Sequence, residues 1–192
     1  NGLVRPDSGE ILVDGIPLDS FAADSVHQEI ALLPQTGTIV AGNILENLTM
    51  FDPSLNQEAL QIAGRLGLDR IVAGMKLGYE TPLGEGAGET LPAGVRQIIT
   101  IVGALVRKPS VILFDEANIS IDMHGDQLLR DYLAEQKGKC IMVLVTHRPS
   151  LLSLADKVYS LVDGHLREGI AESRSDASIA ESASADRLAV LE

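Results

Sequence analysis

Two acidic residues and a histidine follow apolar runs at places where they could act on a phosphate group. Asp115 and Glu116 come directly after the run Val111–Phe114, and His147 follows the run Cys140–Val145. Continuous apolar runs of this kind are typical of strands in a parallel sheet that is covered on both faces. In such sheets, ligands bind beyond the carboxyl ends of the strands. Phosphoryl transfer needs a carboxylate for Mg²⁺, a group that orients water and a donor near the phosphate.

Each of these residues also has an interpretation without chemistry. An acidic pair after a strand is more often the cap of the next helix, and a single histidine after a strand commonly has no chemical role. A third polar residue, Gln35, follows the short run Ile30–Pro34, which the proline ends and which predicts another buried strand. The hypothesis of a phosphate site therefore depends on the elements around these three positions.

The surrounding pattern predicts alternating strands and helices. Strand, helix and strand in succession imply a right-handed parallel crossover between residues 111 and 145. We expect a small β element near residues 10–15, a group of helices over 42–74 that is broken at Asp52–Pro53, a shaped glycine-rich loop over 78–94, and helices over 95–106 and 125–136. The fold class is therefore α/β with a parallel sheet core.

Composition and charge restrict the classes of partner. The net charge of −12 opposes binding to nucleic acid, which usually needs a basic surface. A single cysteine excludes a disulfide framework, and no apolar run reaches the roughly 18–20 residues that cross a bilayer, so we expect the chain itself to be soluble. The first residues read as the middle of a domain. After residue 169 the sequence turns to Ala, Ser and acidic residues, which predicts a weak helix or a disordered tail over 170–192.

With these motifs taken in order, the chain resembles the nucleotide-binding domain of ABC transporters of the exporter type, from Gly2 to about Gly169. The segment Gly42–Leu48 is similar to a G-T-I-x-E-N-L segment of exporters, and Gln35 matches the Q-loop. The remaining matches are Tyr79–Glu85 with an exporter-specific loop, Val111–Glu116 with Walker B, Ile119–Asp122 with the D-loop, and His147 with the H-loop histidine.

The resemblance implies a P-loop NTPase-like sheet with an inserted helical subdomain at about 42–106, within one ATPase domain over residues 1–169. It also implies ATP hydrolysis coupled to transport by a partner membrane domain, at the cytoplasmic face of a membrane. The cofactors would be ATP and Mg²⁺. A second nucleotide-binding domain, identical or different, would complete a head-to-tail dimer.

The same resemblance assigns roles to single residues. Asp115 would hold Mg²⁺ together with Gln35, which would also sense the γ-phosphate. Glu116 would polarise the attacking water and His147 would contact the γ-phosphate, while Asp122 would be the D-loop residue near the nucleotide. Glu85 would contact the membrane domain.

Two departures from the family pattern predict that this chain is inactive alone. The motif G-x-x-x-x-G-K-[ST], whose backbone and lysine cradle the phosphates, is not found in the 192 residues. The second departure lies in the signature motif L-S-G-G-Q, where the chain reads Leu91, Pro92, Ala93, Gly94 and Val95. Pro92 removes a hydroxyl and a backbone N–H, and Ala93 adds a methyl group where backbone would approach phosphate. We expect a weak ATP site in the partner subunit.

Two other functions fit parts of the pattern. A non-catalytic ABC-like structural or regulatory module would explain the altered signature, but Glu116 and His147 oppose a complete loss of chemistry. An ABC-type ATPase of DNA repair or chromosome structure would share Walker B and the signature. The acidic charge and the loop at Gly84–Glu85 oppose this second alternative.

Overall fold

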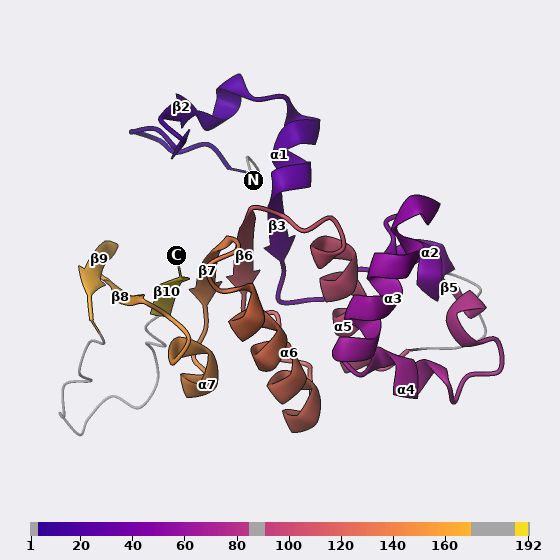
Figure 1. Cartoon of the computed structure of the whole chain (residues 1–192). Coiled ribbons are helices and arrows are strands. Elements are labelled where there is room, and N and C mark those ends of the chain that lie inside the picture. The colour runs from indigo at the N-terminus through magenta and orange to yellow at the C-terminus, as the bar shows by residue number, and fades with distance from the viewer. Residues whose placement is uncertain (1–3, 85–90, 170–186, 192) are drawn as a thin grey trace.

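The computed structural model describes residues 4–84, 91–169 and 187–191. A six-stranded sheet with the order β3-β6-β7-β10-β8-β9 forms its centre (Figure 1). The strands β3 (Ile30–Leu33), β6 (Val111–Asp115) and β7 (Ile141–Val145) are parallel neighbours and match the three runs that the sequence predicts as strands. The expected α/β class is confirmed.

One face of these three strands is buried and the other is only partly covered. The buried side chains alternate along each strand and are Ala31, Leu33, Ile112, Phe114, Met142 and Leu144. The residues between them, such as Leu32, Leu113 and Val143, keep intermediate exposure, and Ile141 is exposed. The expectation that the run Val111–Phe114 is covered on both faces is therefore wrong for the described residues, because the buried side chains of α5, α6 and α7 form one core with those of the Phe114 face.

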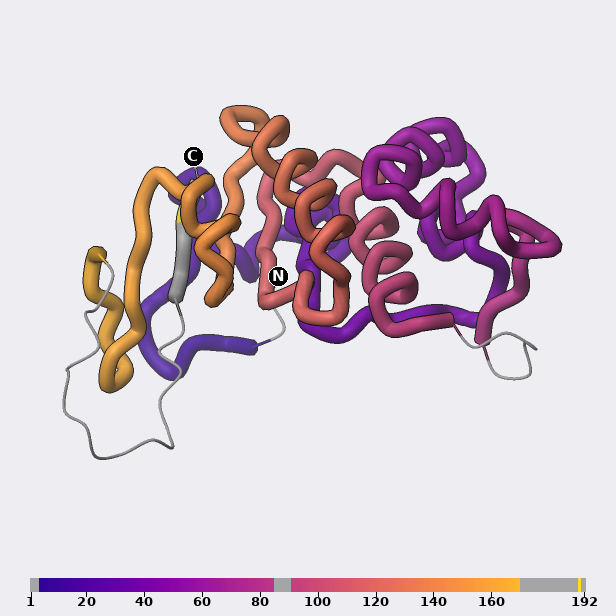
Figure 2. Tube along the Cα trace, turned by 90° about the horizontal axis from the view of Figure 1, so that it is seen from below, coloured from indigo at the N-terminus to yellow at the C-terminus, as the bar shows by residue number. Residues whose placement is uncertain are grey.

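The helices fall into two groups, one against the sheet and one beside it (Figure 1). α6 (Met123–Gln136) and α7 (Pro149–Leu152) lie against the sheet, while α2 (Ile44–Leu48), α3 (Asn56–Arg65), α4 (Leu68–Val72) and α5 (Ala93–Leu105) pack together as a helical layer beside it (Figures 1 and 2). The short α1 (Ala23–Glu29) leads into β3.

Local sequence explains where these helices begin. Asn43 accepts a hydrogen bond from the Glu46 N–H at 2.8 Å while the Glu46 carboxylate accepts one from the Asn43 N–H, which is a capping box for α2. Asp122 caps α6 through Gly125 N at 2.8 Å, so this helix begins two residues before the predicted start. Pro92 takes the N-cap position of α5, whose start also precedes the prediction.

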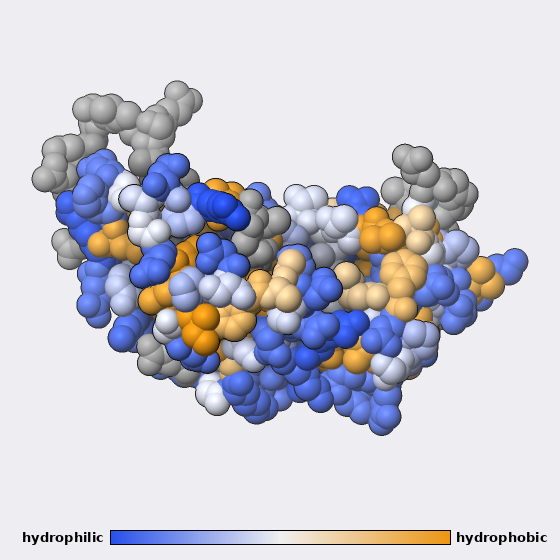
Figure 3. All heavy atoms as spheres, turned by 90° about the horizontal axis from the view of Figure 1, so that it is seen from above, coloured by the Kyte–Doolittle hydropathy of each residue, from blue (hydrophilic) through white to orange (hydrophobic). Residues whose placement is uncertain are grey.

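The N-terminal part is a small β hairpin that exposes apolar side chains. β1 (Leu12–Val13) and β2 (Ile16–Pro17) pair across a turn in which Asp14 and Gly15 both have positive φ, and the 3-10 helix η1 (Leu18–Ser20) follows. Exposed apolar residues gather here: Val4, Ile11, Leu12, Ile16 and Phe21. Figure 3 looks onto this side and shows hydrophobic residues at the surface among hydrophilic ones.

The loop between α4 and α5 is anchored before it leaves the described residues. η2 (Pro53–Leu55) fills the break predicted at Asp52–Pro53, and η3 (Gly78–Glu80) opens the loop. β5 (Pro82–Leu83) then pairs with β4 (Gly42–Asn43). Asn43 Nδ2 donates to Glu80 Oε2 at 2.9 Å, so the loop is tied to the start of α2.

The last strands correct the prediction for the tail. β8 (Lys157–Val162) and β9 (His165–Glu168) form an antiparallel hairpin, and β10 (Arg187–Leu191) lies between β7 and β8, antiparallel to both. The expectation of a weak helix or disordered tail is wrong for residues 187–191, because this segment pairs with two strands of the sheet. Residues 170–186 lie outside the described residues, and the domain boundary at 169 stays a prediction.

Candidate functional site

The polar residues predicted at the carboxyl ends of the strands come together in the structure. Glu116 accepts a hydrogen bond from Gln35 Nε2 at its Oε2, at 3.2 Å, and its Oε1 lies 2.8 Å from His147 Nε2. Gln35 follows β3, Glu116 follows β6 and His147 follows β7, so parallel pairing of neighbouring strands brings the three side chains to one edge. We call Gln35, Glu116 and His147 the carboxyl-edge cluster.

The backbone at Glu116 is held in an unusual conformation. Its φ is 44°, which lies in the left-handed region that residues other than glycine rarely adopt. The Glu116 N–H donates to Val145 O at 3.0 Å, so the adjacent strand β7 fixes this turn. Strained residues of this kind are found at binding and catalytic sites when the surrounding structure fixes them.

The loop that carries Gln35 is attached to α5. Gln97 is fully buried and its Nε2 donates to Pro34 O at 2.8 Å, while Thr100 Oγ1 donates to Thr38 O at 3.0 Å. A Cβ at Gly37 would lie 2.8 Å from backbone atoms of Arg96 and Gln97, so only glycine permits this approach without a shift. The sequence did not indicate this contact, because Gln97 resembles any polar residue of a helix.

A second set of polar side chains lies next to the cluster and holds the segments that follow β6 and β7. Arg148 Nη1 lies 3.1 Å from Asp126 Oδ1, and Arg148 Nη2 donates to Asn118 O at 3.1 Å. The Asn118 amide also donates to the Asp126 carboxylate, and Asn118 is almost fully buried. We call Arg148, Asp126 and Asn118 the supporting triad. The sequence did not reveal it, since nothing in the spacing pairs Asn118 with a residue thirty positions later.

The predicted Mg²⁺ ligands have suitable chemistry. Asp115 is exposed at the end of β6, one residue before Glu116, and the Gln35 amide is the other predicted ligand. Mg²⁺ prefers oxygen ligands and in phosphate sites is held by one or two carboxylates plus the phosphates themselves. Among the described residues no group of three or more His, Cys, Asp or Glu side chains could hold a metal ion. One carboxylate and one amide oxygen are donors that suit an ion whose other ligands come from a phosphate.

The signature segment lies against the predicted D-loop. Leu91 is buried, Pro92 caps α5, and a Cβ on Gly94 would lie 2.6 Å from Ser120 O. Asp122, which the resemblance places near the nucleotide, is engaged as the cap of α6. No contact joins Leu91–Gly94 to the carboxyl-edge cluster among the hydrogen bonds of the described residues. Glu85 lies outside the described residues.

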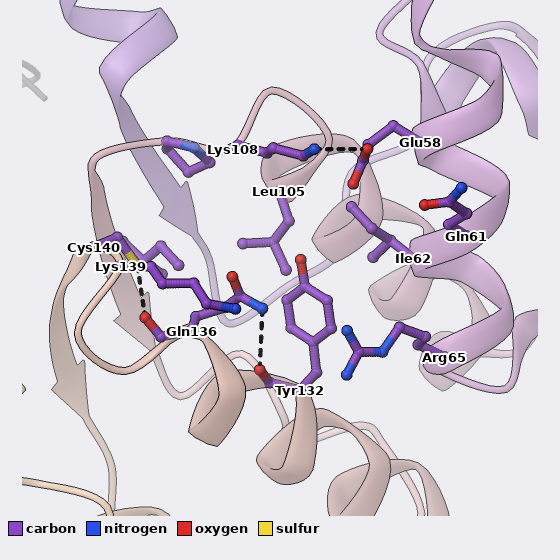
Figure 4. Close-up of a pocket in the computed structure, with 12 residues that line it drawn as sticks. Glu58, Gln61, Ile62, Arg65, Leu105, Lys108, Tyr132, Gln136, Lys139 and Cys140 are labelled. Carbon is purple, nitrogen blue, oxygen red and sulfur yellow. Dashed lines mark hydrogen bonds and ion pairs between the residues drawn. The ribbon is translucent and has the colours of Figure 1, made fainter.

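A cavity of about 370 Å³ is found elsewhere, at the joint between the helical layer and α6 (Figure 4). Arg65 lies over the Tyr132 ring, 5.0 Å from its centroid, and Lys108 pairs with Glu58 at 2.8 Å. The cavity is also lined by Cys140, next to the amino end of β7, which is the edge of the sheet opposite the cluster. This cavity is therefore separate from the cluster.

Comparison with known proteins identifies the family. The family model described as ABC transporter matches residues 1–118. The chain belongs to the ABC transporter family. It is thus a member of an ATPase family, and its sheet and helices have the P-loop NTPase-type fold of an exporter nucleotide-binding domain. A solved bacterial Atm1-family ABC exporter with ATP bound matches with a TM-score of 0.77 and 25% identity, over 85% of this chain and 29% of that one.

Two of the curated relatives are secretion proteins. The chain is 30% identical over 161 residues to the type I secretion system ATP-binding protein PrsD of Rhizobium meliloti, and 32% identical over 161 residues to the colicin V secretion/processing ATP-binding protein CvaB of Escherichia coli. Each alignment covers 83% of this chain, but the chain spans only 28% and 23% of the two relatives. None of the helices in the described part of the chain is long and apolar enough to cross a membrane.

Proposed function

We propose that this chain is the greater part of the ATP-binding domain of an ABC exporter, and that it works with a membrane domain to couple ATP hydrolysis to transport. The observation that supports this most directly is the carboxyl-edge cluster, in which Glu116 contacts both Gln35 and His147. A non-catalytic module would not need to hold a carboxylate, an amide and an imidazole together at the edge where phosphates bind.

The geometry suggests how the cluster acts on a nucleotide. Glu116 is the group that accepts a proton from water or orients it, because the bond from its N–H to Val145 O fixes the turn that carries it and its carboxylate lies at the edge of the sheet between Gln35 and His147. His147 donates a hydrogen bond to the γ-phosphate. Gln35 contacts the same phosphate, and the loop that carries Gln35 is bound to α5 through Gln97, so this contact can affect α5. Both Glu116 oxygens have protein partners, so a water that Glu116 orients takes the place of one of them.

Magnesium and ATP would bind next to this cluster. Asp115 would hold Mg²⁺ together with Gln35, and the ion would neutralise charge on the phosphates. Asp122 remains the predicted D-loop contact, and its role as helix cap keeps the loop 119–122 in place for that purpose. These assignments rest on the resemblance and on the exposed position of Asp115 at the sheet edge.

The partners follow from the same proposal. Leu91, Pro92, Ala93 and Gly94 would face the ATP bound by a second nucleotide-binding domain, and Glu85 would contact the membrane domain at the cytoplasmic face. The anchoring of residues 78–84 to the start of α2 supports this role, because it gives the loop before Glu85 a fixed base. The strongly acidic charge of the chain disfavours a nucleic-acid partner.

The 192-residue chain is expected to bind Mg-ATP weakly and not to turn it over, since it carries no G-x-x-x-x-G-K-[ST] motif. Equilibrium titration of the purified chain with Mg-ATP should give a Kd above about 1 mM. The matched titration uses Glu116→Gln, which keeps the side-chain shape and should bind no more tightly. Micromolar affinity with steady hydrolysis would mean that the site uses phosphate contacts other than those of the family.

A further inference from the structure

The cavity between the helical layer and α6 contains a buried hydroxyl group that has no protein partner. Tyr132 is only 7% exposed, and its hydroxyl points from α6 into the cavity (Figure 4). Within the described part of the chain, Gln136 Nε2 donates to the backbone oxygen of Tyr132 at 3.5 Å, and no hydrogen bond reaches the Tyr132 hydroxyl. A polar group buried this deeply normally has a hydrogen-bond partner. The hydroxyl is therefore placed to bind a molecule that occupies the cavity.

The cavity also has one positive charge that no carboxylate balances. Three cations line it, which are Arg65, Lys108 and Lys139. The first pairs with Glu135 and the second with Glu58, the latter at 2.8 Å, whereas Lys139 forms no ion pair in the ranges that the structure describes. Figure 4 shows the Lys139 side chain extending into the cavity toward Gln136. In a chain with a net charge of −12, this is a local site for a single negative charge.

The other groups of the wall add no negative charge. Burial raises the pKa of Tyr132, and burial also raises the pKa of the Cys140 thiol, so both groups are neutral at pH 7. The rest of the wall includes apolar side chains from α3, α5, β6 and the segment before it, which are Ile62, Leu105, Ile112 and Pro109. The cavity thus combines one ammonium group and one hydroxyl donor with an apolar surface.

The size and charge of the cavity restrict the class of ligand. Its volume of about 370 Å³ lies near the lower end of the range of small-molecule sites, which is about 300–1,000 Å³. Hydrogen bonds to an ionised acceptor are stronger than those between neutral groups, so a carboxylate suits Lys139 and the Tyr132 hydroxyl. A phosphate dianion would need a second cation that is not already paired. A small monocarboxylate with an apolar body meets all three conditions.

We propose that the cavity between α3 and α6 is a binding site for a small monocarboxylate with an apolar body. The carboxylate accepts hydrogen bonds from Lys139 Nζ and Tyr132 Oη, and the apolar body packs against Ile62 and Leu105. This inference rests on the cavity alone and does not depend on the proposed ATPase function.

Titration with benzoate tests the site first. The 192-residue chain labelled with ¹⁵N is titrated with sodium benzoate, and sodium chloride at equal concentration is the control for ionic strength. The amide signals of Lys139 and Cys140 should shift in a saturable way with a Kd on the order of 1 mM, as expected for a ligand of this size. Benzamide has nearly the same shape but no charge, so it should bind about tenfold more weakly.

Two variants test the two donors of the site. Lys139→Met removes the charge and keeps the length of the side chain, and Tyr132→Phe removes only the hydroxyl. Each should raise the Kd for benzoate about tenfold, because each removes a hydrogen bond to the carboxylate. Lys76→Met is the matched control, since Lys76 is exposed and does not line the cavity. It should leave the Kd unchanged.

Three results would overturn the proposal. The first is the absence of saturable shifts with benzoate, which would mean that water alone occupies the cavity. The second is equal affinity for benzoate and benzamide, which would show that the cavity does not recognise the charge. The third is a Kd for Lys139→Met and Tyr132→Phe that equals the Kd for Lys76→Met, which would place the bound benzoate elsewhere. The amide spectrum of each variant shows whether it is folded.

Discussion

At the scale of single residues, two sets of polar side chains with different roles lie next to each other in the segments that follow β6 and β7. The carboxyl-edge cluster has the exposed groups that a ligand would contact, while the supporting triad is more deeply buried and fixes the turns that carry them. Arg148 joins the two, because it directly follows His147 and holds both Asp126 and the backbone of Asn118. Its removal should therefore affect stability before it affects chemistry.

We expect Arg148→Ala to lower the free energy of unfolding by about 1.5–3 kcal/mol, the worth of a hydrogen bond to a charged group. The Asp126 side chain is only 13% exposed, so water compensates little for the lost partner. Arg130→Ala is the matched control, because Arg130 pairs with Asp131 on the surface and should cost at most about 0.5 kcal/mol. Denaturant unfolding of both variants measures the difference, and equal losses would contradict a supporting role for Arg148.

At the scale of elements, α5 connects the signature segment to the loop of Gln35. Its first turn lies against Ser120, and Gln97 holds the loop after β3. The helix is thus fixed at two points that the proposed function uses. Two predictions concern these points.

Gly37→Ala should lower the free energy of unfolding by about 1–3 kcal/mol, since the new methyl group would overlap the α5 backbone. Gly64→Ala is a control of the opposite sign. Gly64 lies in α3 and a Cβ there meets nothing within 4 Å, so this change should raise the stability by about 0.5–1 kcal/mol. Thermal unfolding of the two variants under one condition is the measurement. If both variants were stabilised, the close packing of the Gln35 loop on α5 would be wrong.

The signature prediction rests on the proposed function. In the transporter that contains this chain, Pro92→Ser with Ala93→Gly should restore a hydroxyl and a backbone N–H to the partner's ATP site. Two hydrogen bonds to charged phosphate amount to about 3–6 kcal/mol, or two to four powers of ten in affinity. ATP-driven dimerisation and ATPase rate should rise together. Val95 is left unchanged because it is buried in the core, where glutamine would bury an amide.

The control for this change is Pro92→Ala with Ala93→Gly, which restores the N–H but not the hydroxyl and should recover only part of the gain. Unchanged dimerisation and ATPase rate in a folded Ser–Gly variant would show that another defect limits the site.

Sequence patterns predicted where the strands of this fold lie better than they predicted which faces of those strands are buried. The apolar runs located β3, β6 and β7, and their parallel pairing explains why Gln35, Glu116 and His147 meet. Burial on each face depends on which helices pack there, and no pattern within a strand records that. β10 was missed because its four apolar residues follow a polar segment and gain their hydrogen-bond ladder only from distant strands.

At the scale of the whole molecule, the helical layer and the sheet meet around Tyr132. Burial raises the pKa of Tyr132 above its usual value of 10.0, against a smaller lowering by the nearby Arg65 guanidinium. A raised pKa in the folded state means that the neutral phenol contributes stability that is present below pH 10 and is lost as the pH rises through the folded value.

We expect the free energy of unfolding of the parent and that of Tyr132→Phe to depend differently on pH. Between about pH 8 and about pH 11 the parent should lose stability relative to the variant, by about 1.4 kcal/mol for each unit of pKa difference. Other groups that titrate in this range are common to both chains and cancel. Denaturant unfolding across the series provides the values, and parallel curves would show that Tyr132 has the same pKa in both states.

The partly covered face of the sheet also affects how stability varies with temperature. Apolar side chains such as Leu32, Leu113 and Val143 already contact water in the folded chain, so unfolding wets less new apolar surface than it would in a domain of equal length with a closed core. The heat capacity increment of unfolding follows that surface, and for this length a closed domain would give about 2.3–2.9 kcal/mol/K. A smaller increment makes the curve of free energy against temperature flatter. Cooling and warming from the temperature of maximum stability should therefore destabilise this chain gradually.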